Sequence, residues 1–231
     1  MIESTIKLAK RYNLESANSR GLANLFKGIS NLKGELLTAE KGECPRTIMV
    51  TSSLPGEGKT ITSIIIARSL VDLSHDKVLL IDASGAKQAF DGWYKIDNKV
   101  LGLCDVLADT ATVESIVFAT DHEQIDIAVY GDRADISSKT FDSGRFAEVL
   151  NDLKNKYDFI VVDSPAFLSS STAALMTKNF DGLVVVVQCK KTKKQIVHQV
   201  MNKIELLGGN VIGTVMNYRT YYLPRWLYKW L

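Results

Sequence analysis

The chain alternates between near-continuous apolar runs and segments whose apolar positions recur at helical spacing. The apolar runs lie at 77–82, 157–163, 182–188 and 210–216, and a β-branched stretch precedes residue 51. Runs of this kind are typical of parallel strands that are buried on both faces. Helical spacing follows at 61–70, 143–156 and 193–207. The alternation predicts an α/β fold, in which helices cover both faces of a mostly parallel sheet.

Apolar residues also recur at helical spacing ahead of the first predicted strand. They predict one or two amphipathic helices between about residues 14 and 40. We therefore expect a single-domain protein with an N-terminal helical arm (1–46), an α/β core (47–217) and an aromatic C-terminal tail (218–231). The residues that carry the helical spacing in the arm are Leu22, Leu25, Phe26, Ile29, Leu32, Leu36 and Leu37.

Composition narrows the function classes only slightly. With 231 residues and 46% hydrophobic content, the chain can bury a substantial core. A formal net charge of +2 gives no reason to expect binding to nucleic acid. The three cysteines lack metal-ligand spacing, which favours a reducing compartment, and no apolar run approaches the ~20 residues of a membrane helix. We expect a cytoplasmic protein.

The segment between the first strand and the next helix carries the clearest chemical signal. It reads Ser53-Leu-Pro-Gly-Glu-Gly-Lys-Thr60 and matches the phosphate-loop pattern G-x-x-x-x-G-K-[ST], except that Ser53 replaces the first glycine. The loop glycines let backbone N–H groups point at phosphate oxygens, Lys59 can reach the β- and γ-phosphates, and Thr60 can hold Mg²⁺. The sequence therefore predicts a nucleotide site. Its expected loop contacts are Pro55, Gly56, Glu57, Gly58, Lys59, Thr60 and Ile61.

Two of the predicted strands end in a carboxylate. Asp82 closes one strand and Asp163 closes another, and ligands of parallel sheets bind at the carboxyl ends of strands. Phosphoryl transfer needs a positioned Mg²⁺ and an oriented nucleophile. Asp163 is thus predicted to hold Mg²⁺ together with Thr60, and Asp82 to orient or deprotonate the nucleophile. The alternative is that each caps a helix or turn.

Together these segments resemble the bacterial tyrosine kinases (BY-kinases) of capsular and exopolysaccharide synthesis, within the MinD/ParA-like P-loop ATPases. A positioning ATPase of the ParA or MinD type is expected to carry a signature lysine where this chain has Leu54. The resemblance covers nearly the whole chain. Its carriers are the phosphate loop and the segments 78–82, 101–107, 146–150, 157–165, 181–182 and 211–217.

The resemblance implies an activity and a setting. It implies ATP- and Mg²⁺-dependent autophosphorylation of a C-terminal tyrosine cluster, in which the tail of one subunit enters the active site of its neighbour. It implies Lys59, Asp82 and Asp163 as catalytic residues. It implies that Asn217, at a strand end, contacts the nucleotide base. It also implies a separate membrane-bound polysaccharide co-polymerase or adaptor that recruits the kinase to the inner face of the cell membrane, and assembly of the kinase into a homo-oligomer.

The tail fits this activity, because four of the chain's eight tyrosines lie in it. The competing interpretation is an aromatic and basic anchor for a membrane interface or a partner groove, since Trp226 and Trp230 alternate with basic residues there. The two interpretations have equal weight. The candidate phosphate acceptors are Tyr218, Tyr221, Tyr222 and Tyr228.

The chain also departs from the family pattern at two places. The family motif Asp-x-Asp-x-Arg after the second strand has Ser84 and Ala86 in place of its second Asp and its Arg. The Glu-x-x-Arg-x-x-Arg motif for ring assembly aligns with Asn24, Lys27 and Ser30. The first change favours a rival function, a nucleotide-binding pseudokinase that regulates a polysaccharide export complex.

Overall fold

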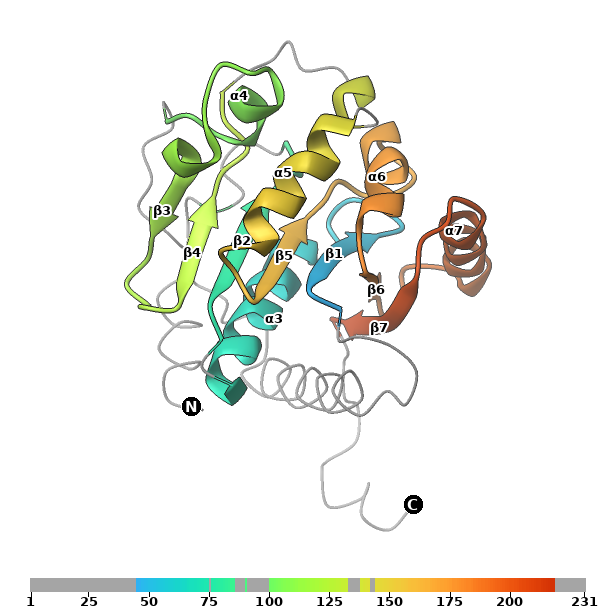
Figure 1. Ribbon diagram of the computed structural model, residues 1–231. Helices are drawn as coiled ribbons and strands as arrows, with labels where there is room; N and C mark the ends of the chain where they lie inside the picture. Colours follow the sequence, from blue (N-terminus) through green and yellow to red (C-terminus); the bar gives the residue numbers. More distant parts are fainter. Residues whose placement is uncertain are drawn as a thin grey trace.

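A computed structural model describes residues 45–74, 76–85, 90, 100–132, 138–141 and 144–218 of the protein. Seven strands form one sheet in the order β3-β4-β2-β5-β1-β6-β7 (Figure 1). All neighbouring strands are parallel except β3 and β4, which are antiparallel at one edge. The strands are β1 (Thr47–Ser52), β2 (Val78–Asp82), β3 (Val117–Ala119), β4 (Ile125–Ala128), β5 (Phe159–Asp163), β6 (Gly182–Gln188) and β7 (Val211–Asn217).

Helices cover both faces of the sheet, as predicted. Figure 1 shows α5 and α6 in front of the sheet and α3 behind it. Alternate residues of the central strands enter the two layers: Met49 faces the core under α5 and α6, whereas Ile48 and Val50 face the core under α3. The helices are α3 (Lys59–Ser74), α4 (Leu103–Leu107), α5 (Gly144–Lys154), α6 (Ser171–Met176) and α7 (Lys194–Leu206), with short 3-10 turns η2 (Val113–Ile116), η3 (Ser138–Phe141) and η4 (Thr177–Asn179).

The predicted elements within the described residues are confirmed. Their ends differ by one or two residues, except that α3 continues to Ser74, four residues beyond the predicted pattern. The sequence pattern did not predict β3, β4, α4 and α6, which have between three and six residues each. Such short elements do not repeat a period often enough to give a signal. The predicted arm lies outside the described residues except for 45–46, as does the tail except for Tyr218.

The register of the central strands brings the predicted chemistry to one edge of the sheet. Asp82 is the cross-strand partner of Asp163, and Asp163 is also the partner of Val50. Neighbouring strands lie about 4.8 Å apart, so both carboxylates stand within two strand spacings of the phosphate loop. The parallel sheet therefore places all three parts side by side.

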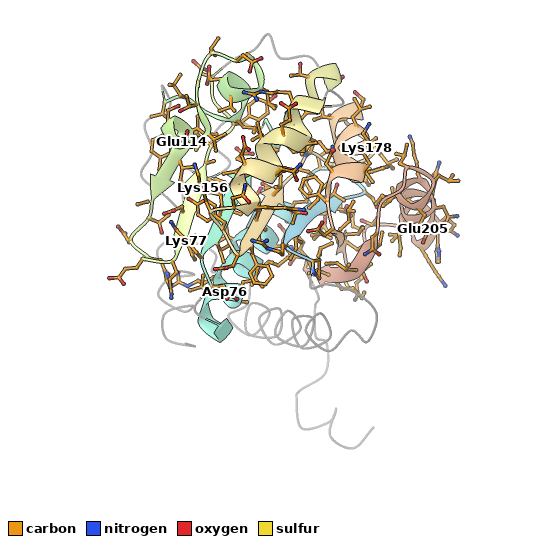
Figure 2. All side chains as sticks on the ribbon, viewed as in Figure 1. Asp76, Lys77, Glu114, Lys156, Lys178 and Glu205 are labelled. Atoms are coloured by element: carbon orange, nitrogen blue, oxygen red, sulfur yellow. The ribbon has the colours of Figure 1, made fainter. Side chains whose placement is uncertain are left out.

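Ion pairs lie on the surface around this core. Lys156, in the turn after α5, pairs with Glu114 of η2 (Figure 2). Lys77 lies 3.5 Å from Asp126 of β4. Pairs of this kind usually stabilise a protein by less than about 1 kcal/mol. The fold thus depends on the two apolar layers. No helix in the described part of the chain has both the length and the apolarity that crossing a bilayer requires.

Candidate functional site

The phosphate loop joins the end of β1 to the first residue of α3, Lys59. Gly56 and Gly58 have φ angles of 79° and 94°, a left-handed conformation that glycine adopts at little cost. Ser53, at the first glycine position of the pattern, is not among the residues with positive φ. Because a side chain is compatible with the backbone there, the departure from the pattern leaves the loop intact.

Glu57 fastens the loop from inside the protein. Its side chain is buried, and one carboxylate oxygen accepts a hydrogen bond of 2.8 Å from the N–H of Leu54. The other oxygen accepts hydrogen bonds from the N–H of Gln188, at the end of β6, and from the hydroxyl of Thr192. Buried carboxylates are costly unless they are hydrogen-bonded in this way. Glu57 therefore fixes the conformation of the loop and connects it to the end of β6.

Asn217, the last residue of β7, packs directly against the loop. Its side-chain amide donates a hydrogen bond of 3.0 Å to the carbonyl oxygen of Glu57. A Cβ atom placed on Gly58 would lie only 2.0 Å from the Asn217 amide nitrogen. The φ of 94° favours glycine at position 58, and a side chain there would also displace the Asn217 amide from its hydrogen bond.

Lys59 and Thr60 reach from the first turn of α3 toward Asp163. The Thr60 hydroxyl donates a hydrogen bond of 2.6 Å to Asp163 Oδ2. Burial lowers the pKa of Lys59, and the negative charges of Asp163 and Glu57 oppose this change. Phosphates are favoured here because the N-terminus of α3 adds its own partial positive charge and unpaired N–H groups.

Asp163 is fully buried and only partly satisfied. Burial raises its pKa to about 7, despite the Thr60 hydrogen bond and the charge of Lys59, and nearby Asp82 adds to the rise. Its Oδ1 atom has no hydrogen-bond partner among the described residues. A buried carboxylate oxygen that lacks a partner next to a phosphate loop fits Mg²⁺, which takes one or two carboxylates and completes its shell with water and phosphate oxygens.

Asp82 is held by Ser84, one of the two residues at which this chain departs from the family motif. The backbone N–H and the hydroxyl of Ser84 donate to Asp82 Oδ1 at 2.8 and 2.7 Å. Ser84 thus has a hydroxyl donor where the family motif has a second negative charge. Asp82 remains the carboxylate that stands beside Asp163 at this end of the sheet.

The structure brings most of the predicted site residues together. Pro55 and Gly56 are at the exposed tip of the loop, while Ile61 lies in the first turn of α3 and packs against the core. Ala86, the arm motif and three of the tail tyrosines lie outside the described residues. Sequence reasoning missed the support that Gln188 and Thr192 give to Glu57, because nothing in a sequence marks partners that are more than a hundred residues away.

This arrangement of parallel sheet, glycine loop, lysine, threonine and buried aspartate defines a P-loop nucleotide-binding protein. The family model described as AAA domain matches residues 45–213. Among curated proteins, the chain is 30% identical to tyrosine-protein kinase CpsD of Streptococcus pneumoniae over 176 residues, 76% of this chain and 77% of that protein. It is 27% identical to the putative tyrosine-protein kinase CapB of Staphylococcus aureus, over 85% of this chain and 84% of that protein.

Solved structures agree with these matches. The kinase domain of VpsO has a TM-score of 0.76 and 28% identity, covering 89% of this chain and 98% of that one. The septum site-determining protein MinD of Pyrococcus horikoshii, complexed with Mg-ADP, has the same fold, with a TM-score of 0.64 and 24% identity over 79% of this chain and 75% of that one. The protein belongs to the BY-kinase family.

The contact at Gly58 leads to a first prediction. Gly58→Ala should weaken ATP binding by at least about a hundredfold, because its Cβ would overlap the Asn217 amide and a positive φ strains alanine. Isothermal titration calorimetry with ATP measures the loss. Gly208→Ala is a matched control, since Gly208 has a φ of 79° and open space around its Cβ position. Equal ATP affinity in the two variants would contradict the prediction.

The buried carboxylate leads to a second prediction, for nucleotide-free protein. Because the pKa of Asp163 is about 7 in the folded state against 3.8 ordinarily, the folded state keeps a proton that the unfolded state loses between these pH values. This contribution to the unfolding free energy is therefore lost as pH rises. Asp163→Asn should remove this pH-dependent contribution. Between pH 5 and pH 8, the unfolding free energy of the variant should therefore rise by about 2–3 kcal/mol relative to that of wild type.

Urea unfolding of both proteins at several pH values measures this gain. Parallel pH profiles for wild type and Asp163→Asn would show that the carboxyl group titrates normally in the folded state.

Proposed function

We propose that the protein is an ATP-dependent protein-tyrosine autokinase that regulates the synthesis and export of capsule or exopolysaccharide. The observation that carries the proposal is the pairing of Asp163, whose Oδ1 is buried without a hydrogen-bond partner among the described residues, with Asp82 on the neighbouring strand. Curated relatives named as tyrosine-protein kinases support the same activity.

Mg²⁺ is the second component of the proposed site. Thr60 and Asp163 would hold the ion. When bound, it would neutralise charge on the phosphates. No cluster of three or more His, Cys, Asp or Glu side chains occurs in the part of the chain that the structure describes. A site of one carboxylate, one hydroxyl and substrate phosphates is consistent with that finding.

The proposed reaction transfers the γ-phosphoryl group of ATP to a tyrosine. The tyrosine oxygen forms a bond to the γ-phosphorus while the bond from that phosphorus to the β,γ-bridging oxygen breaks, and ADP leaves. Asp82 accepts the phenol proton, which a group with a reference pKa of about 10 does not release readily at neutral pH. Lys59 neutralises the charge that develops on the phosphate oxygens.

The acceptors and the setting of the reaction are further parts of the proposal. The acceptor candidates are the tail tyrosines Tyr218, Tyr221, Tyr222 and Tyr228. Recruitment to the inner face of the cell membrane would come from a membrane-bound co-polymerase or adaptor. Tyrosine-protein kinase wzc of Salmonella typhimurium matches 92% of this chain but only 30% of its own length, so most of that protein lies outside the kinase match.

A phosphotransfer assay tests the proposal. Phosphatase-treated protein is incubated with ATP and Mg²⁺, and phosphate is located by intact-mass and peptide mass spectrometry. Wild type should gain phosphate on tail tyrosines, and Lys59→Met should not, because the charge that neutralises the phosphates is gone. Lys203→Met removes an exposed lysine of α7 and should behave as wild type. Tight ATP binding without phosphate on any tyrosine, even with the adaptor present, would favour the pseudokinase.

The contact between Ser84 and Asp82 leads to a further prediction. Ser84→Ala should lower the rate of tyrosine phosphorylation about tenfold, because a hydrogen bond that orients the carboxylate is lost. The ATP affinity should stay within about twofold, since the phosphate loop is untouched. Rates come from a time course of phosphotyrosine formation at saturating ATP. An unchanged rate would mean that the Ser84 hydroxyl does not position Asp82.

A further inference from the structure

Tyr218 is fixed against the phosphate loop of its own chain. Its backbone N–H donates a hydrogen bond of 2.8 Å to Asn217 Oδ1, and Asn217 in turn holds the carbonyl oxygen of Glu57. The Cε2 atom of the Tyr218 ring lies 3.7 Å from the position of a Cβ on Gly58. The φ angle of Tyr218 is 56°, which is unusual for a residue other than glycine. These contacts set the first tyrosine of the tail beside the loop.

The order of the strands divides the nucleotide site into two ends. Along the sheet, the strand ends carry Asp82 (β2), Asp163 (β5), the phosphate loop (β1), Gln188 (β6) and Asn217 (β7). Both carboxylates lie on one side of the loop, which is the side for the reacting γ-phosphate. A nucleotide with its triphosphate in the loop therefore extends its base toward the other side, where β6 and β7 end.

The position of Tyr218 at the end of β7 also determines whether it can accept phosphate in its own chain. Four strand spacings separate β2 from β7, which amounts to about 19 Å. The backbone of Tyr218 thus lies across the phosphate loop from Asp82 of its own chain, the proposed base. Tyr218 contacts the loop through its ring, and the residue is 49% exposed, which leaves surface open to a ligand.

We propose that Tyr218 is a binding residue for the nucleotide base, which stacks on its aromatic ring, and that it is not a phosphate acceptor. The inference rests on the proposed nucleotide site and adds Tyr218 to the end at which the base contact of Asn217 is expected. Stacking on an aromatic ring suits any base, because every base has a π face. The acceptors are then left to the three later tyrosines of the tail.

Binding of two probes to the full chain tests this inference. Tyr218→Ala should weaken ATP binding about tenfold, while binding of inorganic tripolyphosphate, which lacks a base, stays within about twofold. Tyr218→Phe should restore ATP affinity, because the ring is retained. Met216→Ala is the matched control, since Met216 is an exposed side chain two residues earlier on β7. Thermal unfolding of each variant checks that the fold is intact.

Three outcomes would overturn the inference. Tyr218→Ala could bind ATP as Met216→Ala does, or could lose ATP and tripolyphosphate equally, which would make the ring a support for the loop. Phosphate mapped on Tyr218 in wild type would make it an acceptor. Failure of the proposed function is distinguishable from failure of this inference. If the variants show the expected binding differences but wild type transfers no phosphate, the base-binding role of Tyr218 stands and the kinase activity is refuted.

Discussion

The register between β2, β5 and β1 is the constraint on which the rest of the site depends. Because Asp82 is paired with Asp163, and Asp163 with Val50, two carboxylates and a phosphate loop end at one edge of the sheet. Apolar layers on both faces hold these strands in place, and a shift by one residue would turn each side chain to the opposite face. The chemistry is therefore fixed by core packing at positions that never touch a ligand.

Asp163 shows that the site sacrifices stability of the empty protein for function. A fully buried carboxyl group with a raised pKa and a buried oxygen without a hydrogen-bond partner among the described residues is costly. Its environment is suited to a cation that joins it to phosphate oxygens. Glu57 is buried too, but hydrogen bonds satisfy both of its oxygens, so it serves the shape of the loop. The contrast separates a structural carboxylate from a functional one.

Sequence patterns predicted the central strands, the loop and both strand-end carboxylates, because long apolar runs and a glycine loop leave strong local signals. Short elements such as β4 and α6 left none. The contacts of Asn217 and Tyr218 with the loop also escaped prediction, since they join segments about 160 residues apart. Ser84 was correctly recognised as a departure from the family motif, but only the structure shows that it donates two hydrogen bonds to Asp82. Local signals thus identified the chemistry, and tertiary contacts determine how it is held.

The central claim is that one carboxylate, Asp82 supported by Ser84, suffices for transfer of phosphate to tail tyrosines. The most direct measurement mixes unlabelled wild type with a ¹⁵N-labelled Lys59→Met chain, adds ATP and Mg²⁺, and maps phosphate on each chain by mass. The account predicts phosphate on Tyr221, Tyr222 or Tyr228 of the labelled chain, delivered by the active site of its neighbour. Absence of phosphate from every tail tyrosine of both chains would contradict it.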